Sequence, residues 1–439
     1  MSAVIEAPRH FCALGAQQTV LAIERAVPLL HAGPGCGAKL WGGLSFCNGF
    51  QGAGYLGGST VPSTNVSEKE AVFGGTDRLE QVIRNALKIM DADLFVVLTG
   101  CVPDLVGDDT GQVVRRFQER GHPLVYAETG GFKGNTYQGH ELVVQAVIDQ
   151  YLAPQTEKIP GLVNVWSVVP YLDPFWSGNL QALKELLAGI GLEANMLFGP
   201  GSGGAAAWRK VPAAQFNLVV SPWVGLQTAQ HLEAKFGTPY CHYPVLPIGA
   251  TETGRFLRSV AAFAGIGEAG VEAYIKSQEE NFFYYLERAA DFLLEFRYDL
   301  PGRFVTVADS FYTLGVSRFL ANDLGLLPGP QFITDEAPEA HQQPLAAHFG
   351  ALAPDIAAAV HFIPDGGPIF QKIRDAHLQH PLIIGSIWDK DIAAALHGYH
   401  VSISLPVTER LVLDRSYIGY RGGLRLTEDI YAAVLGSYQ

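Results

Sequence analysis

Three cysteines near the start of the chain lie in loops of small residues, a setting suited to metal-bound thiolates. Cys36 ends the turn His31–Cys36 (HAGPGC), Cys101 closely follows the apolar run Leu94–Leu98, and Cys12 precedes the sequence ALGA before a predicted helix. Small residues let backbone N–H groups approach a bulky anion, and the sulfurs of an iron–sulfur cluster accept such hydrogen bonds. The three thiols are therefore candidate ligands of an iron–sulfur cluster.

The number of candidate thiols indicates whether this chain alone could hold a cluster. A cubane cluster usually takes four protein ligands, so three leave a deficit. Of the other two cysteines, Cys47 lies in an aromatic-rich segment, and we expect Cys241 to be structural. If a cluster is bound, the missing ligands come from another residue type or from a second subunit. The alternative is that the thiols simply pack as small apolar side chains.

Short apolar runs alternate with helical segments along most of the chain. The runs are nearly continuous in Val, Ile, Leu and Phe, which is typical of strands buried on both faces of a parallel sheet. We expect strands at Leu94–Thr99, Pro123–Ala127, Val163–Val169, Asn195–Phe198, Leu218–Ser221, Phe304–Ala308, Gln331–Thr334, Val360–Ile363, Leu382–Gly385 and Val401–Leu405. Apolar residues at helical spacing predict helices over Asp77–Met90 and Asn179–Ile190. The pattern predicts an α/β fold.

Length and composition limit the classes of protein. A chain of 439 residues suggests about three domains, and composition shifts place them at 1–155, 156–298 and 299–439. The net charge is -13 and no basic patch is visible, which argues against nucleic acid as a partner. No apolar run reaches the roughly 18 residues of a membrane span, and no signal peptide is apparent. We therefore expect a cytoplasmic protein that does not bind membranes.

The sequence resembles the nitrogenase component 1 family, and the resemblance covers nearly the whole chain. The matching segments are Cys12–Ala16, His31–Cys36, Ser67–Gly75, Thr99–Asp109, Asn179–Lys184, Pro222–Trp223, Pro247–Gly249, Ile384–Ser386, Pro406–Arg410 and Ile418–Gly423. The resemblance implies three doubly wound, Rossmann-like domains with mostly parallel sheets. It also implies that Cys12, Cys36 and Cys101 hold half of an [8Fe-7S] P-cluster, which a homologous subunit completes with three more thiolates.

Two missing residues indicate which kind of subunit the chain resembles. In the family, one subunit holds the active-site iron–sulfur cofactor through a cysteine in its middle domain and a histidine in its last domain. The corresponding segments here, Leu192–Phe198 and Asp414–Gly423, contain neither. The chain thus resembles the β-type, K-like subunit. This resemblance implies an α2β2 heterotetramer with a D-like partner that carries the cofactor, and a separate Fe-protein-type reductase that binds ATP.

The sequence also departs from the molybdenum enzymes of the family. Glu128–Gly134 lacks the serine found near the P-cluster of their β-subunits, although Thr129 could in principle take its place, and Gly49–Gly58 is unusually rich in glycine. These departures favour the nitrogenase-like branch, with an organosulfur substrate that reacts on the partner. Asp104, Asp108 and Asp109 resemble a metal site, but we expect them to cap helices.

Three other functions stay open at this point. The chain resembles the family's cofactor-assembly scaffolds, which keep a similar fold but release a cofactor instead of reducing a substrate. It also resembles tetrapyrrole reductase subunits, in which the shared cluster is a single [4Fe-4S] cubane. If the three thiols are structural, a bilobed α/β binding protein without a cluster remains. Substrate reduction and iron content distinguish these functions.

Overall fold

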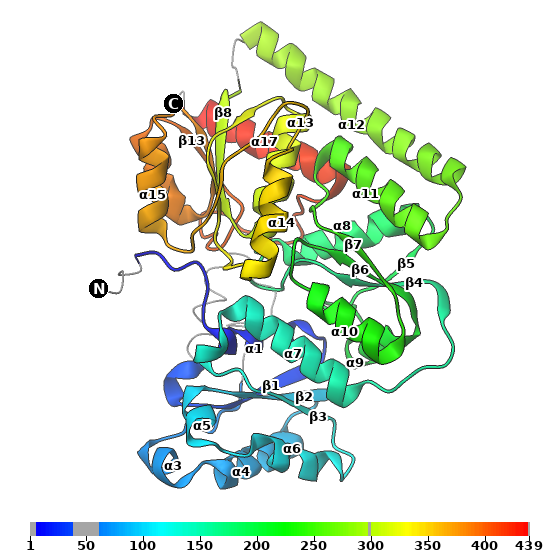
Figure 1. Cartoon of the computed structure of the whole chain (residues 1–439), viewed down its shortest axis with the longest axis vertical. Coiled ribbons are helices and arrows are strands. Elements are labelled where there is room, and N and C mark those ends of the chain that lie inside the picture. The colour runs from blue at the N-terminus through cyan, green and yellow to red at the C-terminus, as the bar shows by residue number, and fades with distance from the viewer. Residues whose placement is uncertain (1–5, 38–60, 297–299, 438–439) are drawn as a thin grey trace.

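The computed structural model describes residues 6–37, 61–296 and 300–437, and within them the chain forms three parallel β-sheets (Figure 1). Each sheet is formed by its own stretch of sequence, and helices pack against all three. Cys47 and the segment Gly49–Gly58 lie outside the described residues. No helix in the described part combines the length and the apolar character that crossing a bilayer requires.

The N-terminal sheet has the strand order β1-β2-β3, with all pairs parallel. The extended segment 62–66 bonds to the free edge of β1: Leu30 N–H donates to the Pro62 carbonyl at 2.8 Å, and Thr64 N–H donates to the Leu30 carbonyl at 2.9 Å. The chain therefore leaves β1 on one side and returns as β2 on the other. The elements are η1 (Ala13–Ala16), α1 (Gln17–Ala22), β1 (Ala26–His31), η2 (Pro34–Cys36), α3 (Glu68–Phe73), α4 (Thr76–Ile89), β2 (Leu94–Thr99), α5 (Cys101–Val106), α6 (Thr110–Gln118), β3 (Leu124–Ala127), η4 (Gly131–Lys133) and α7 (Thr136–Tyr151).

The middle sheet has the order β5-β4-β6-β7, which reverses between β4 and β6. It is followed by two long helices, of which α12 runs along the outside of the molecule in Figure 1. The elements are β4 (Ile159–Trp166), α8 (Trp176–Gly189), β5 (Glu193–Asn195), α9 (Gly204–Lys210), η5 (Val211–Ala213), β6 (Ala214–Val220), α10 (Leu226–Phe236), β7 (Tyr240–Tyr243), α11 (Gly249–Ala264) and α12 (Glu268–Phe296).

The C-terminal sheet has the order β11-β10-β8-β12-β13, which reverses at β8, and β9 pairs with β8 beside this path. The last helix, α17, leaves this sheet and packs against α11 and α12 of the middle region. The elements are β8 (Arg303–Ala308), α13 (Ser310–Asn322), β9 (Leu327–Pro328), β10 (Gln331–Ile333), α14 (Glu339–Phe349), β11 (Val360–Phe362), α15 (Gly366–Asp375), β12 (Leu382–Gly385), η6 (Ile387–Asp389), α16 (Lys390–Ala395), β13 (Tyr399–Ser402) and α17 (Gly419–Gly436).

The expected α/β fold with parallel sheets is confirmed, as is each expected helix within three residues of its ends. The expectation of a strand at Asn195–Phe198 was wrong in position, because β5 ends at Asn195. The sequence pattern gives no strand over 26–31, since Pro28 interrupts it. Pro28 is tolerated there because segment 62–66 begins to pair with β1 only at Leu30. The domain boundaries remain a prediction with which the three separate sheets agree.

A buried polar junction joins the middle and C-terminal sheets. Asp173 accepts hydrogen bonds from Asn179 Nδ2 at 2.6 Å and from the Tyr312 hydroxyl at 2.9 Å, which links the loop after β4 to α13. Asp309 caps α13 through the Tyr312 N–H, and Asp335 accepts the Trp223 indole N–H at 3.0 Å. Burial raises the pKa of all three carboxyl groups, that of Asp173 to about 6. Burial thus makes ionisation of these three carboxyl groups less favourable than in water.

Asp309 provides a test of this junction. Burial, followed by the nearby Asp335, raises the pKa of Asp309 well above its ordinary value, so the folded chain holds a proton that the unfolded chain releases above about pH 4. The free energy of unfolding should therefore fall as the pH rises from that value. Asp309→Asn keeps the helix cap without an ionisable group. We expect it to flatten the fall, measured by chemical denaturation at several pH values.

The matched control is Asp375→Asn, which changes an exposed aspartate at the end of α15. It should leave the pH profile of the parent chain unchanged. A profile for Asp309→Asn as steep as that of the parent would show that Asp309 is not the protonated group.

Candidate iron–sulfur site

The candidate site lies at the carboxyl ends of β1 and β2, where segment 62–66 bonds to the outer edge of β1 and β2 pairs with its other edge. Ligands of open α/β sheets bind at this end of the strands. Cys36 lies in η2, which follows β1, and Cys101 is the first residue of α5, which follows β2. Cys12 reaches the same edge from the N-terminal segment, directly before η1.

Two glycines show how close the three thiols lie. A Cβ atom at Gly131 would lie 3.0 Å from Cys101 Sγ and 3.4 Å from Cys12 Sγ, so both sulfurs border the same point. A Cβ atom at Gly100 would lie 3.7 Å from Cys36 Sγ and 2.7 Å from the Ala32 Cβ. The structure thus places Cys12 and Cys101 side by side, with Cys36 next to the residue that precedes Cys101. Side chains at the two glycines would fill the space between the sulfurs and the loops.

The surroundings suit thiolates. The Gly131 N–H donates a hydrogen bond to Cys101 Sγ at 3.1 Å, the kind of contact that stabilises a cluster sulfur. Cys101 is exposed, while Cys12 and Cys36 are half-buried. Cys241 differs: it lies buried on β7, and burial raises its pKa to about 11, which agrees with the structural role expected for it.

The residues present fit an iron–sulfur cluster. Within the parts of the chain that the structure describes, no three or more His, Cys, Asp or Glu side chains are grouped closely enough to hold one metal ion. A polynuclear cluster instead spreads its thiolates over several irons. Three thiols at one edge, an N–H donor to sulfur and glycines that keep the space open meet its needs. Cys12, Cys36 and Cys101 would hold it.

The loop after β3 contributes no hydroxyl to the site. Thr129 is fully buried, and its hydroxyl donates to the Thr99 carbonyl at 2.9 Å while its N–H donates to Thr99 Oγ1 at 3.0 Å. These bonds hold the β3 loop against the end of β2. The Thr129 hydroxyl is therefore engaged by the fold, and the neighbouring Gly131 N–H is the group that faces the sulfurs.

The expectation that three aspartates cap helices was correct for one of them. Asp109 caps α6 by accepting the Gln112 N–H at 2.8 Å. Asp104 instead accepts the Gly130 N–H at 3.1 Å, and Asp108 accepts the Gly75 N–H at 2.9 Å. These two carboxylates connect loops rather than cap helices, because the Cys101 loop packs directly against the loops after α3 and β3.

A fully buried histidine links the loops of Cys36 and Cys101. His31 Nε2 lies 2.9 Å from Asp108 Oδ2, and His31 Nδ1 lies 3.2 Å from the Thr64 hydroxyl. Burial lowers the pKa of His31 more than the Asp108 charge raises it, so the ring is neutral near pH 7. The His31 carbonyl also accepts the Gly100 N–H at 2.8 Å. The sequence contained both residues within matching motifs, but nothing in their spacing showed that they pair.

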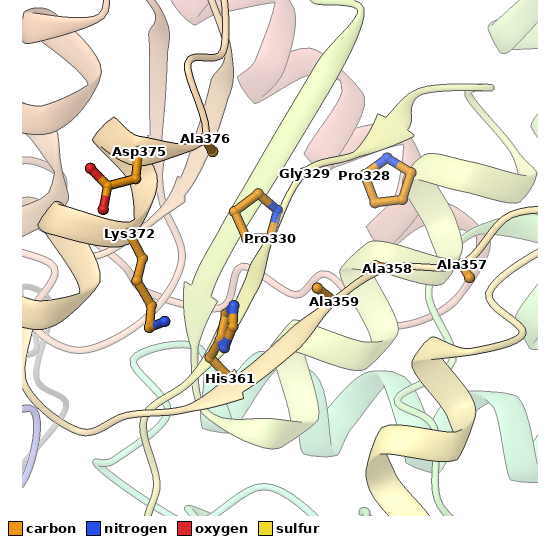
Figure 2. A pocket seen from close by; sticks show the side chains of 10 residues that line it. All are labelled: Pro328, Gly329, Pro330, Ala357, Ala358, Ala359, His361, Lys372, Asp375 and Ala376. Atoms are coloured by element: carbon orange, nitrogen blue, oxygen red, sulfur yellow. The ribbon is translucent and has the colours of Figure 1, made fainter.

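A separate hollow in the C-terminal sheet is a poor candidate site. It has a volume of about 380 Å³ and lies between α15 and the segments that precede β10 and β11 (Figure 2). Pro328 and Pro330 lie on one side, and Lys372 of α15 lies on the other. This is the amino end of the strands, whereas ligands of doubly wound sheets bind at the carboxyl end.

Comparison with known proteins agrees with this geometry. A family model described as nitrogenase component 1 type oxidoreductase matches residues 12–435, so the chain belongs to that family. The chain is 24% identical to the nitrogenase molybdenum-iron protein beta chain of Methanococcus maripaludis, over 97% of this chain and 93% of that one. It is 28% identical to the nitrogenase iron-molybdenum cofactor biosynthesis protein NifE of the same organism, over 67% of this chain but only 58% of that protein.

A solved structure shows the same fold. The structure titled "Nitrogenase Cp1 at pH 6.5" superimposes with a TM-score of 0.82 at 19% identity, covering 100% of this chain and 95% of that one. At this identity the likeness concerns the fold. It confirms the α/β architecture with parallel sheets.

The role of Asp108 in connecting the loops can be tested by measuring protein stability. Asp108→Ala leaves the buried His31 ring and the Gly75 N–H without their acceptor, and we expect a loss of about 2–4 kcal/mol in the free energy of unfolding. The control is the neighbouring Asp109→Ala, which removes one helix cap and should cost about 1 kcal/mol. Denaturant titration measures both. Equal losses in the two variants would contradict the connecting role of Asp108.

Proposed function

We propose that this chain is the K-like subunit of a nitrogenase-like reductase. In this proposal it holds half of an [8Fe-7S] P-cluster through Cys12, Cys36 and Cys101, and a D-like partner in an α2β2 heterotetramer supplies the other half. An Fe-protein-type reductase that binds ATP provides the electrons. The partner carries the iron–sulfur active-site cofactor, and the reaction is reductive C–S cleavage of methylthio-alkanes, as in the K subunit of methylthio-alkane reductase.

The observation that carries this proposal is that all three thiols lie at one edge of the N-terminal sheet, with Cys12 beside Cys101 and Cys36 beside Gly100. When bound, an iron–sulfur cluster supplies one-electron transfer. The chain's own residues hold the sulfurs in place: Gly131 donates its N–H to Cys101, while Gly100 keeps the space beside Cys36 open. Because Cys101 is exposed, a second subunit has access to the side of the site where the ligand set is incomplete.

The choice of the K-like subunit rests on two further observations. The similarity to a nitrogenase beta chain extends over nearly the full length of both chains. In addition, the segments Leu192–Phe198 and Asp414–Gly423 lack the cysteine and the histidine that hold the active-site cofactor in D-like subunits. The thioether substrate rests on the overall resemblance of the sequence to the nitrogenase-like branch of the family, and on no residue that contacts the substrate.

A cofactor-assembly scaffold is the second candidate function, and the similarity to NifE favours it. The fold and the three thiols serve either function. The difference lies in turnover, because a scaffold releases a cofactor whereas a reductase consumes reductant and ATP to convert a substrate. The proposed reductase therefore requires thioether reduction by the purified complex.

An exposed apolar surface beside Cys101 is our candidate for the reductase docking site. It consists of Val72 and Phe73 at the end of α3 and Leu105 and Val106 at the end of α5, two helices in contact with each other. Phe73 is 82% exposed and Leu105 is 73% exposed. Large exposed apolar side chains gathered at one place typically mark a protein interface. A reductase bound here would lie next to the helix that begins with Cys101.

Removing one thiol tests the proposed function. The heterotetramer with Cys101→Ala should lose cluster iron and thioether reduction together, because one ligand and its Gly131 hydrogen bond disappear. The control is Cys241→Ala, which changes a buried thiol in the middle sheet and should keep both. Iron analysis and an assay with dimethyl sulfide, reductase and ATP measure the two quantities. Full iron and activity in Cys101→Ala would exclude Cys101 as a ligand.

A charge placed in the exposed patch tests the docking site. Leu105→Glu introduces a carboxylate that must be desolvated on docking, and we expect the KM for the reductase to rise at least about tenfold, corresponding to about 1.4 kcal/mol. Ile89→Glu is the matched control, since Ile89 is 79% exposed but ends α4 instead. Steady-state turnover at increasing reductase concentration measures the effect. A similar KM for both variants would place docking elsewhere.

A further inference from the structure

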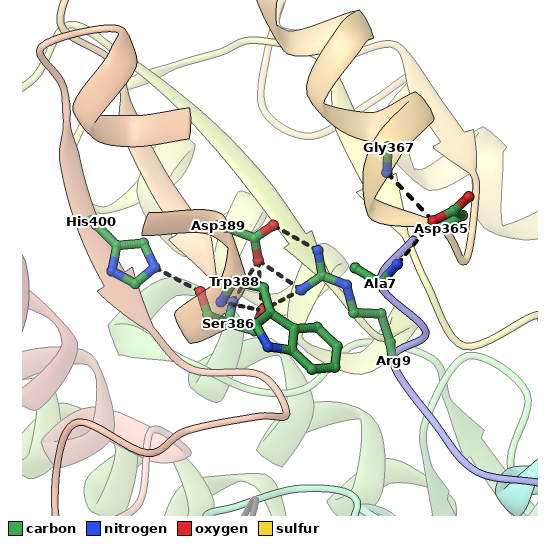
Figure 3. A network of polar contacts seen from close by, with 8 residues as sticks. All are labelled: Ala7, Arg9, Asp365, Gly367, Ser386, Trp388, Asp389 and His400. Carbon is green, nitrogen blue, oxygen red and sulfur yellow. Dashed lines mark hydrogen bonds and ion pairs between the residues drawn. The ribbon is translucent and has the colours of Figure 1, made fainter. Parts of the chain in front are cut away.

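The N-terminal segment 6–10 binds to the C-terminal sheet, although it leads directly into the site of the N-terminal sheet. The N–H groups of Glu6 and Ala7 donate to Asp365 Oδ1 at 2.9 and 3.2 Å, and Asp365 precedes α15. Figure 3 shows Ala7 beside Asp365 and Arg9 reaching toward Asp389. His10 Nε2 lies 3.2 Å from the Thr334 carbonyl, directly after β10. The segment thus follows the carboxyl edge of the third sheet.

Arg9 is the most deeply buried charge of this segment. Its guanidinium forms a two-pronged ion pair with Asp389, with Nη1–Oδ2 at 3.0 Å and Nη2–Oδ1 at 2.8 Å. It also donates to the Ser386 hydroxyl and lies over the Trp388 ring at 5.3 Å. The side chains of Arg9 and Asp389 are only 4% and 0% exposed. Removing one partner of such a pair leaves an uncompensated buried charge.

These partners follow β12, next to the point where the third sheet reverses its strand order. Doubly wound sheets usually bind a ligand in this position. Here the chain's own N-terminal segment lies at this edge, and the two-pronged geometry of the Arg9–Asp389 pair holds it in one register.

The hydrogen bonds change domain at Phe11. The Phe11 carbonyl accepts the Thr136 N–H at 2.9 Å, and the Ala13 N–H donates to the Gly134 carbonyl at 2.9 Å, so these residues bind the start of α7. Cys12 lies between them, three residues after Arg9. Three residues of extended chain span about 10 Å at most. A displacement of Arg9 is therefore transmitted to Cys12 over a short length of chain.

We propose that the Arg9–Asp389 ion pair is a positioning device that makes the C-terminal domain hold Cys12 in the site. One of the three thiols is then tied to a domain that contributes no thiol of its own to the site. In this proposal a shift of the loop after β12 pulls on Cys12 from one side, against the bonds of Phe11 and Ala13 to the start of α7, whereas it exerts no such pull on Cys36 and Cys101. The consequence of this positioning for electron transfer rests on the proposed function. The connection between the Arg9–Asp389 pair and Cys12 does not depend on it.

The test uses the metal-free full-length chain, so that it reads the link itself. Iodoacetamide is the probe, and peptide mass spectrometry measures the alkylation rates of Cys12 and Cys101 in the same sample. In Arg9→Met, freeing segment 6–10 should raise the rate at Cys12 at least about threefold relative to Cys101, because local opening exposes the thiol. In Arg9→Lys, which keeps the charge but loses the two-pronged contact, we expect a smaller rise.

The control is Arg410→Met, which breaks a less buried ion pair in the C-terminal region, that of Arg410 with Asp429 at 2.9 Å. It should leave the ratio of Cys12 to Cys101 unchanged even if the chain is less stable. Unchanged ratios in both Arg9 variants overturn the proposal. If Arg9→Met does not fold, Arg9→Lys decides. A complex that contains no iron would contradict the proposed function and leave this result valid.

Discussion

The geometry of the site depends on close packing of the loop backbone beside the thiols. A Cβ atom at position 131 would lie only 3.0 Å from Cys101 Sγ and 3.4 Å from Cys12 Sγ, and one at position 100 would collide with the Ala32 Cβ at 2.7 Å, beside Cys36. Glycine at both positions lets the loops after β2 and β3 close on the thiols, with a backbone N–H directed at Cys101. Because β1, β2 and β3 are parallel neighbours, the loops that follow them meet at one edge of the sheet. The buried His31–Asp108 pair then holds the loops of Cys36 and Cys101 in a common geometry.

The chain holds its three sheets together with polar groups as well as with apolar packing. Asp173, Asn179 and Tyr312 join the middle and C-terminal sheets, while Arg9 and Asp389 join the N-terminal segment to the C-terminal sheet. Such buried groups contribute little net stability but penalise misplacement strongly, because each leaves an unpaired partner. They therefore favour one arrangement of the domains. In this arrangement Cys12 reaches the same edge as the other two thiols.

The sequence allowed the main features to be predicted where they depend on local pattern. Continuous apolar runs such as Leu382–Gly385 indicated the buried parallel strands. The small residues around the cysteines indicated that these thiols are candidate cluster ligands. What escaped prediction depends on contacts between distant residues. The strand 26–31 was not predicted, because it contains Pro28. A proline is tolerated there since segment 62–66 begins to pair with β1 only at Leu30, so no partner requires the missing N–H of Pro28. Likewise, nothing near Asp108 in the sequence indicated that it would bind His31 rather than cap a helix.

The central claim is that this chain shares a polynuclear iron–sulfur cluster with a homologous partner. Anaerobic co-purification with its D-like partner, followed by iron and sulfide analysis and an EPR spectrum, tests it most directly. The account predicts a heterotetramer with about eight irons in each inter-subunit cluster, in addition to an iron-rich cofactor in the partner. A colourless, iron-free chain from intact anaerobic cells would contradict it. About four irons per heterodimer would instead assign the chain to the tetrapyrrole-reductase branch.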